Sequence, residues 1–351
     1  MSVIVFGSIN IDEVYTVPHI VRPGETITST KRVEVAGGKG ANSCVSAARS
    51  GANTFMYANV GSDGKWVKDI IGESGANTKN ILELQDETTG RAIIQVNEEG
   101  ENSIFLYPGA NHKHVLKNVL DSMQTNGVRK GDYMVLANET NSVYEIIQEA
   151  KSRLGVTVVW NPAPMPTKHT PELANALGYV DVLVVNETEI CDLIKLASTE
   201  YPETVISTAE STGDYSALVE MISDTYGTKI VVVTKGSKGV EASINYGTKK
   251  SDTESRAIIS MAIAPVPQDR VVDTTAAGDT WIGYFVSGLS SSNLVEFFSG
   301  GECNQADVKS SVEKAMGRAN YASGITVTRH GAIPSIPTKQ EVDNFVATNK
   351  V

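Results

Sequence analysis

Short apolar runs alternate with amphipathic stretches along most of the chain. Six runs are apolar at nearly every position, which is typical of strands buried on both faces: residues 3–6, 55–60, 133–136, 157–160, 180–185 and 230–234. Helical periodicity is found near residues 41–50, 65–74, 115–124, 143–153, 187–196, 217–226, 279–289, 308–321 and 340–347. This alternation predicts an α/β fold, a doubly wound and mostly parallel sheet flanked by helices.

Two segments break the alternation. Residues 14–35 are β-like without a following helix, and residues 91–107 have the pattern of a hairpin with its turn at 97–102. We predict that they form a small β-sheet lid (14–35 and 91–108) beside a core of residues 1–13, 36–90 and 109–351. Two polar stretches, about 245–262 and 290–307, are expected to be surface insertions.

Composition narrows the function classes. The net charge of −11 argues against a nucleic-acid or anionic-membrane partner, since both need basic patches. The three cysteines are far apart and form no CxxC pair, which disfavours a disulfide scaffold or a zinc cluster. The first residues lack the features of a signal peptide, and no apolar run approaches the ~20 residues that span a bilayer. We therefore expect a cytoplasmic protein.

The stretch DTTAAGDTWIG at 273–283 carries the strongest chemical signal. Ala276, Ala277 and Gly278 let a ligand approach the backbone at a predicted helix start, where free N–H groups suit a phosphate. A carboxylate at Asp279 would repel a phosphate, but it can take a proton from a nucleophile that attacks one. The pattern therefore predicts a phosphoryl-transfer site. The alternative is an Asp that caps an ordinary helix.

Two polar clusters lie near the start of the chain. GSINID follows the first strand, where α/β proteins bind ligands, and Asn10 and Asp12 could bond sugar hydroxyls. GGKGAN at 37–42 offers close backbone approach, a charge at Lys39 and an amide at Asn42. It is not a P-loop, and the dinucleotide fingerprint GxGxxG is absent. The alternatives are an Asx-turn and a structural glycine turn.

Two further clusters follow buried strands in the second half. NETE at 186–189 is either an N-cap with acidic residues in the first turn or a place where Asn186 and Glu189 lie near nucleotide phosphates and hydrated Mg²⁺. TKGSKG at 234–239 is either a plain turn or a lining of backbone amides for a nucleotide.

The order of these motifs is more specific than any of them alone. GGKGAN, NPAP (161–164), NETE, TKGSKG, DTTAAGDT and VTRHGAIPS (327–335) follow one another, and the chain closely resembles the PfkB-type sugar kinase family from about residue 3 to 337. GSIN-x-D, Glu139 and GENSIFLYPGAN (100–111) resemble the ribokinases within it. The resemblance implies ATP-dependent phosphorylation of D-ribose at O5, with Mg²⁺, to give D-ribose 5-phosphate.

The resemblance also implies roles for individual residues. Asp279 would be the catalytic base, with the amides of Ala276, Ala277 and Gly278 as anion hole. The sugar-binding set would be Asn10, Asp12, Gly38, Lys39, Gly40, Ala41, Asn42 and Glu139. The nucleotide-binding set would be Asn186, Glu189, Thr234, Lys235, Gly236, Ser237, Lys238, Gly239, Gly278, Asp279 and Asn320. A monovalent-cation site, with K⁺ favoured, would involve Asp273, Thr275, Thr326, Arg329, Gly331 and Ser335. The lid would close over the sugar and form a homodimer interface.

The chain departs from the family pattern at two places, and other functions stay open. Trp281-Ile282 stands where Phe-Asn is common, and Tyr107-Pro108 where His-Ala is common. The alternatives are another sugar or nucleoside kinase of this family, acting on 2-deoxyribose or adenosine, and a catalytically silent sugar-binding protein. The polar sugar set favours a bare sugar, and the presence of Asp279 disfavours a silent protein.

Overall fold

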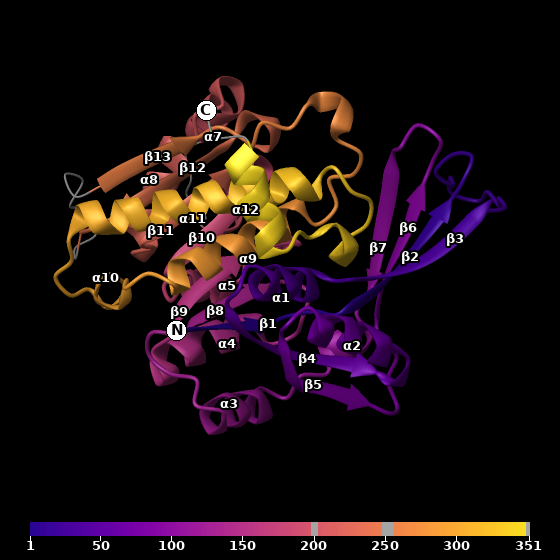
Figure 1. Cartoon of the computed structure of the whole chain (residues 1–351), viewed down its shortest axis with the longest axis horizontal. Coiled ribbons are helices and arrows are strands. Elements are labelled where there is room, and N and C mark those ends of the chain that lie inside the picture. The colour runs from indigo at the N-terminus through magenta and orange to yellow at the C-terminus, as the bar shows by residue number, and fades with distance from the viewer. Residues whose placement is uncertain (198–202, 248–255, 349–351) are drawn as a thin grey trace.

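A nine-stranded sheet forms the centre of the computed structural model, which describes residues 1–197, 203–247 and 256–348 (Figure 1). In order across the sheet, its strands are β13 (Arg256–Met261), β12 (Val240–Asn245), β11 (Ile230–Thr234), β10 (Val182–Asn186), β9 (Thr157–Asn161), β8 (Tyr133–Ala137), β1 (Ser2–Phe6), β4 (Asn53–Gly61) and β5 (Asn77–Leu84). Neighbouring strands are parallel except at β12 and β13, which are antiparallel to theirs. The predicted fold class is confirmed.

Helices cover both faces because side chains alternate along each strand. In β1, Val3 and Val5 pack into one core and Ile4 and Phe6 into the other. The first core is closed by α1 (Lys39–Arg49), α2 (Lys65–Glu73), α9 (Ala277–Ser290), α10 (Val295–Ser299), α11 (Gln305–Thr326) and α12 (Lys339–Thr348). The second is closed by α3 (Leu116–Thr125), α4 (Val143–Glu149), α5 (Pro171–Leu177), α6 (Glu187–Ala197), α7 (Glu203–Thr212) and α8 (Ser216–Tyr226).

The sequence pattern missed elements at the edges of the fold. Strand β5 reads NTKNILEL and β13 reads RAIISM, and both are edge strands whose mixed polarity hides them. The two stretches expected as insertions hold β13 and α10, so they are partly regular structure, while residues 248–255 lie outside the described part. Helix α7 was missed as well, because most of its side chains are polar.

A second sheet of four strands stands beside the core, with the order β3 (Lys31–Gly37), β2 (Asn10–Thr16), β6 (Gly90–Val96) and β7 (Asn102–Tyr107). Two antiparallel pairs are joined by a parallel pairing of β2 with β6, which runs from Asn10 opposite Gly90 to Thr16 opposite Val96. Figure 1 shows this sheet projecting away from the core. Strand β2 begins four residues before the predicted lid segment, so its buried start lies against the core.

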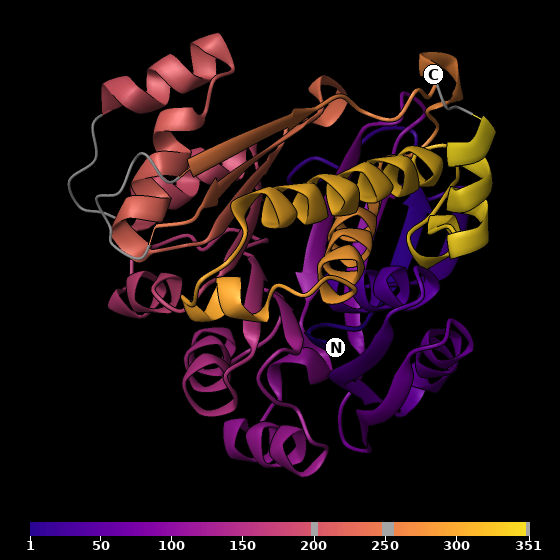
Figure 2. The same ribbon diagram turned by 60° about the vertical axis from the view of Figure 1, so that its left-hand side comes forward.

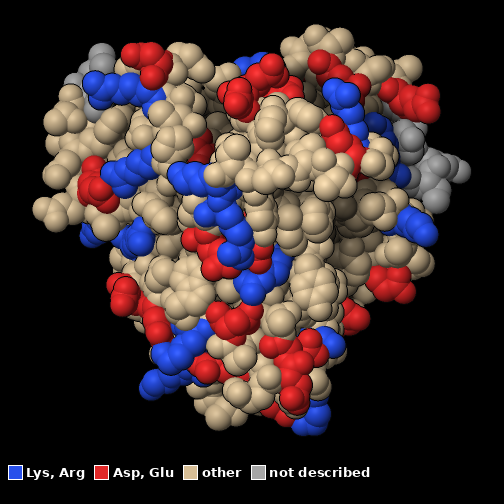
Figure 3. All heavy atoms as spheres, turned by 90° about the vertical axis from the view of Figure 1, so that its right-hand side faces the viewer, with Lys and Arg blue, Asp and Glu red and all other residues tan. Residues whose placement is uncertain are grey.

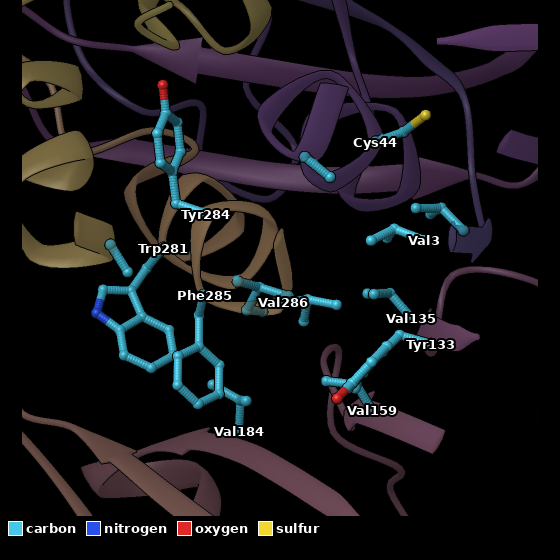
Figure 4. Packing of buried hydrophobic residues seen from close by; sticks show 14 of the residues in the cluster. Val3, Cys44, Tyr133, Val135, Val159, Val184, Trp281, Tyr284, Phe285 and Val286 are labelled. Carbon is cyan, nitrogen blue, oxygen red and sulfur yellow. The ribbon is translucent and has the colours of Figure 1, made fainter. Parts of the chain in front are cut away.

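Helix α9 is the most enclosed helix near the carboxyl ends of the strands. Figure 2 shows α11 lying across α9, and on its other side α9 meets α1. The contact with α1 is close because a Cβ on Gly283 would lie 2.4 Å from the Cβ of Ser46. Figure 4 shows Trp281 and Phe285 of α9 above Val184 of the sheet. These contacts fix the first turn of α9, which carries Asp279.

Candidate active site

Polar residues gather where the parallel strands end. Ser8 follows β1, Glu139 follows β8, and Asn161, Asn186 and Thr234 are the last residues of β9, β10 and β11. The carboxyl ends of parallel strands meet at one edge of a sheet, and this is where open α/β folds bind ligands. Lys39, Gly40, Asn161 and Asp279 line a small cavity at this edge.

Asp279 lies in the first turn of α9 but does not cap it. The N-cap position is Ala276, a non-glycine residue with φ +60°, and no side chain caps the helix there. Instead the Asp279 carboxylate, which is buried, accepts a hydrogen bond from Asn42 Nδ2 at 2.8 Å. The N-cap interpretation of this motif is therefore wrong.

Lys39 supplies a positive charge beside this carboxylate. Its Nζ lies 3.9 Å from Asp279 Oδ1. The attraction of Asp279 raises the pKa of the Lys39 ammonium, against the opposing effect of burial. Since Lys39 and Asn42 both belong to α1, the GGKGAN motif and the Asp279 motif meet in one place.

The glycines of this motif allow a close passage of two backbones. A Cβ on Gly40 would lie 2.5 Å from the Ser8 nitrogen, and one on Gly37 would lie 2.1 Å from Asp12 Oδ2. Gly38 has φ +96°, which side chains disfavour. The structural reading of the glycines is thus correct, and it also explains how Asp12 comes near Lys39.

Glu139 connects the residues after β1 with the GGKGAN motif. Its Oε2 accepts hydrogen bonds from the Ser8 hydroxyl and, at 2.9 Å, from the backbone N–H of Lys39. The N–H of Gly40 donates to Ser8 Oγ at 3.3 Å. Ser8 is a residue that the sequence reasoning did not assign to the site.

Asp12 is buried near two other carboxylates. Burial raises its pKa from the usual 3.8 to about 7, and the charges of Glu139 and Asp279 add to this effect. Asn42 Oδ1 is also buried, and within the described residues it has no hydrogen-bond partner. The site therefore offers a carboxyl group and an amide oxygen that a ligand with several hydroxyl groups could satisfy.

Asn111 is a second residue that the sequence reasoning left without a role. It is buried, its Oδ1 accepts from the Ile9 N–H at 2.9 Å, and its Nδ2 donates to Ile9 O at 3.2 Å and to Asn10 Oδ1 at 2.8 Å. The signal that could have found it is its place at the end of PGAN, directly after the hairpin. Asn111 thus orients the Asn10 side chain.

The NETE motif forms a capping box at the start of α6. The Asn186 side chain accepts from the Glu189 N–H at 2.8 Å, and the Glu189 side chain accepts from the Asn186 N–H at 2.9 Å. Asn161 Nδ2 also lies 3.4 Å from Glu189 Oε2. The N-cap interpretation of NETE is therefore correct.

The TKGSKG turn holds its two lysines in ion pairs. Lys235 Nζ lies 3.0 Å from Glu241 and Lys238 Nζ lies 3.1 Å from Glu187. Gly239 has φ +101°, and a Cβ there would lie 2.3 Å from the Met261 carbonyl oxygen. The turn therefore packs closely against the end of β13.

Asn320 lies on α11 and uses both ends of its amide within the protein. Its Oδ1 accepts from the Trp281 indole N–H at 2.8 Å, and its Nδ2 donates to the Ala262 carbonyl oxygen at 2.8 Å. This links the helix of Asp279 to the residues beside the TKGSKG turn.

The segments of the predicted cation site meet at Asp273. The carboxylate accepts from the N–H of Thr275 at 2.9 Å and of Gly331 at 2.8 Å. Burial would raise the pKa of Asp273, but these hydrogen bonds outweigh it and hold the pKa below its usual value. The Arg329 guanidinium pairs with Glu341 at 2.6 Å, and the Thr326 hydroxyl is buried against Thr280. Ser335 Oγ donates to Ala332 O.

The described residues contain no group of three or more His, Cys, Asp and Glu side chains placed to hold a metal ion. None of their helices combines the length and the apolar character that crossing a membrane requires.

The sequence pattern described as "pfkB family carbohydrate kinase" matches residues 1–339. The chain belongs to this family. A pfkB kinase transfers a phosphoryl group to a sugar, with ATP as the donor, and the chain is such an enzyme. A curated ribokinase of Haemophilus influenzae is 33% identical over 347 residues, covering 97% of each chain.

Solved structures agree with this membership. A ribokinase of Cryptococcus neoformans in complex with ADP has a TM-score of 0.73 at 32% identity, covering 98% of this pfkB kinase and 99% of that chain. An Arabidopsis thaliana ribokinase complexed with ribose and ATP has a TM-score of 0.74 at 27% identity, covering 98% of both chains.

Proposed function

We propose that this chain is a ribokinase, which transfers the γ-phosphoryl group of ATP to O5 of D-ribose and releases D-ribose 5-phosphate and ADP. One observation carries the proposal: a buried Asp279, held by Asn42 and Lys39, lies close enough to Asp12 for its charge to act on that carboxyl group, as the charge of Glu139 does. This supports a base beside groups suited to sugar hydroxyls. The full-length similarity to ribokinases supports the choice of sugar.

In the reaction, Asp279 accepts the proton of the ribose 5-hydroxyl as O5 attacks the γ-phosphorus. The O5–P bond forms while the bond from phosphorus to the bridging oxygen breaks, and ADP leaves. The amides of Ala276, Ala277 and Gly278 form the anion hole for the transferring group, because amides at a helix start have no acceptor within their helix. The Ala277 N–H also donates to the Thr274 carbonyl oxygen at 3.2 Å, so it would have to be shared with the phosphoryl group. Lys39, whose Nζ lies 3.9 Å from Asp279 Oδ1, adds positive charge near the phosphoryl group.

The sugar is bound by side chains and backbone from three segments. Asn10 and Asp12 reach it from the start of β2 and Glu139 from the residues after β8, with the 38–42 backbone and Asn42 beneath. Asn42 Oδ1, which has no partner among the described residues, accepts a ribose hydroxyl. Closure of the small sheet over the sugar would exclude water from the reaction.

The nucleotide lies over the ends of β10 and β11, on Asn186, Glu189, the 234–239 turn and the residues near Asn320. Mg²⁺ suits this place because it keeps several waters and binds chiefly through the phosphates of its nucleotide. The ion neutralises phosphate charge when it is bound. Glu189, whose Oε2 lies 3.4 Å from Asn161 Nδ2, is the carboxylate that would hold its waters.

A monovalent cation, K⁺ in the first place, is proposed beside the anion hole. The donor set fits, since the Asp273 carboxylate and neighbouring backbone carbonyls are oxygen ligands. Arg329 and Thr326 take part through their backbone, because their side chains are engaged elsewhere. The protein's own contribution is to hold the Asp273–Gly331 contact, which orders the loop before α9. Equal rates in potassium and in a bulky-cation buffer of matched ionic strength would refute this site.

We propose a homodimer through the small sheet. Ile104, Phe105, Leu106 and Tyr107 of β7 are all exposed, and since successive side chains point to opposite faces, both faces of this strand are open. Figure 3 shows charges of both signs side by side on this end of the molecule, so a second copy is not repelled. Light scattering that gives a monomer mass at micromolar concentration, with and without ribose, would contradict the dimer.

The activity is tested by coupled ADP release with ribose, 2-deoxyribose, fructose and adenosine. We expect the highest kcat/KM with ribose, because a missing 2-hydroxyl leaves a buried polar group without its partner. A higher kcat/KM with adenosine would identify a nucleoside kinase instead. Binding of ribose without turnover would identify a sugar-binding protein. We place the reaction in the cytoplasm, where the unpaired Cys44, Cys191 and Cys303 stay reduced.

A further inference from the structure

Trp281 lies two residues after the base on α9, and its indole reaches toward α11. It is buried and stacks on Phe285 with ring centroids 4.6 Å apart (Figure 4). Its single polar atom, Nε1, donates to Asn320 Oδ1 at 2.8 Å. The bond therefore joins α9 to α11 through side chains.

Asn320 also connects α11 to the residues that follow β13. Its Nδ2 donates to the carbonyl oxygen of Ala262 at 2.8 Å, so both ends of the amide have a partner within the protein. A Cβ on Gly324, one turn further along α11, would lie 2.6 Å from Ala264. Helix α11 therefore contacts the 262–264 segment at two points, Ala262 and Ala264.

The 262–264 segment in turn supports the TKGSKG turn. A Cβ on Gly239 would lie 2.3 Å from Met261 O and 3.3 Å from the Cα of Ala262. Any shift of Ala262 would therefore reach the turn that we assign to the nucleotide. Between Asn320 and Gly324, α11 also holds the first turn of α9, because Ser323 Oγ donates to Ala277 O at 2.9 Å.

We propose that Trp281 is a positioning residue for ATP: through Asn320 and Ala262 it fixes the nucleotide-binding turn relative to Asp279. The assignment rests on the proposed function of the 234–239 turn. Asn320 then acts through the segment it holds rather than as a direct ligand. The indole N–H is the required feature, since phenylalanine at this position packs similarly but has no donor.

The test is a double-mutant cycle of Trp281→Phe and Asn320→Ala in the full-length protein. Each single variant is expected to raise KM for ATP about 3- to 10-fold, with KM for ribose and kcat within about twofold. Trp281→Phe loses the partly buried bond to Asn320, and Asn320→Ala loses that bond together with the bond to Ala262. The double variant is expected to equal Asn320→Ala alone, because both changes break the same chain of contacts. The dissociation constant for ADP, measured by calorimetry, should change among the variants in the same way as KM for ATP. This measurement needs no catalytic turnover.

Two controls make the result specific. Trp66→Phe removes a half-exposed tryptophan on α2 and should leave both KM values unchanged. A protein that keeps only Trp281, with Trp66 and Trp160 replaced by phenylalanine, should change its emission on adding ATP but not on adding ribose. If Trp281→Phe folds poorly, Asn320→Ala and this emission signal still decide the question.

Additive effects in the cycle, an unchanged KM for ATP in the single variants, or an equal rise in KM for ribose would each overturn the assignment. A wild-type protein without ATP-dependent phosphorylation of ribose would instead refute the proposed function, and ADP binding by the same variants would still report on Trp281.

Discussion

The sugar half and the nucleotide half of the site are built in different ways. On the sugar side, contacts join distant parts of the chain: Asn42 and Asp279 are 237 residues apart, and Ser8 and Glu139 are 131 apart. On the nucleotide side, Asn186 and Glu189 are three residues apart, and Lys235 and Glu241 are six. The first half exists only in the completed fold, whereas much of the second is local.

The two halves also differ in how their charges are balanced. The sugar side groups Asp12, Glu139 and Asp279 around one ammonium, Lys39, in a buried space. The nucleotide side pairs each lysine of its turn with one carboxylate, Lys235 with Glu241 in a partly buried pair and Lys238 with Glu187 near the surface. Substitutions in the buried half should therefore have large effects, and substitutions in the paired half small ones.

The largest effect is expected for Asp279→Asn. The change keeps the shape of the side chain but removes the base, so kcat with ribose should fall about 10²- to 10⁴-fold while ADP binding is retained. Steady-state kinetics and calorimetry measure the two quantities. Asp307→Asn, in the exposed first turn of α11, is the matched control. Activity of Asp279→Asn within threefold of wild type would rule out the base.

Asp12 predicts a pH dependence of stability. Its folded pKa of about 7 exceeds the unfolded value of 3.8, so the folded state holds the extra proton between these values. Wild type should therefore lose about 2–4 kcal/mol of unfolding free energy relative to Asp12→Asn as the pH rises from about 4 to 7. Urea titrations of both proteins across this range measure the difference. A constant difference would show that Asp12 is ionised throughout.

Asn111→Ala tests the support of the sugar side. Loss of the amide leaves Ile9 and Asn10 without their partners, and KM for ribose should rise about tenfold, with KM for ATP within twofold. Asn126→Ala, which removes an exposed asparagine directly after α3, should change neither KM. Equal rises of both KM values would point to general loosening of the structure instead.

The smallest effect is expected for Lys238→Ala. The side chain is 69% exposed and pairs with Glu187, and such pairs contribute less than about 1 kcal/mol. KM for ATP should stay within about twofold, as for the control Lys117→Ala, another exposed pair. A tenfold rise in KM for ATP would mean that Lys238 leaves Glu187 to bind phosphate. The sugar side and the nucleotide side would then differ less in their sensitivity to substitution.

The sequence predicted the central sheet because its strands are apolar on both faces, and it predicted the glycine and Asp279 motifs because each is contiguous. Edge strand β13 was missed because one of its faces is open, which gives it the polarity of a loop. Asn111 and the Trp281–Asn320 bond were missed for another reason. An Asn or Trp side chain shows no partner until the fold brings together residues 101 and 39 positions apart.

The enclosure of α9 has a consequence for heat inactivation. A helix buried on nearly every side exchanges its amide hydrogens only when the whole domain opens, so the alignment of Asp279 is protected by the full free energy of unfolding. Strand β7, open on both faces, lacks that protection. Hydrogen exchange should be slowest in α9 and fastest in β7. On warming, the small sheet over the sugar should therefore unfold before the helix that aligns Asp279.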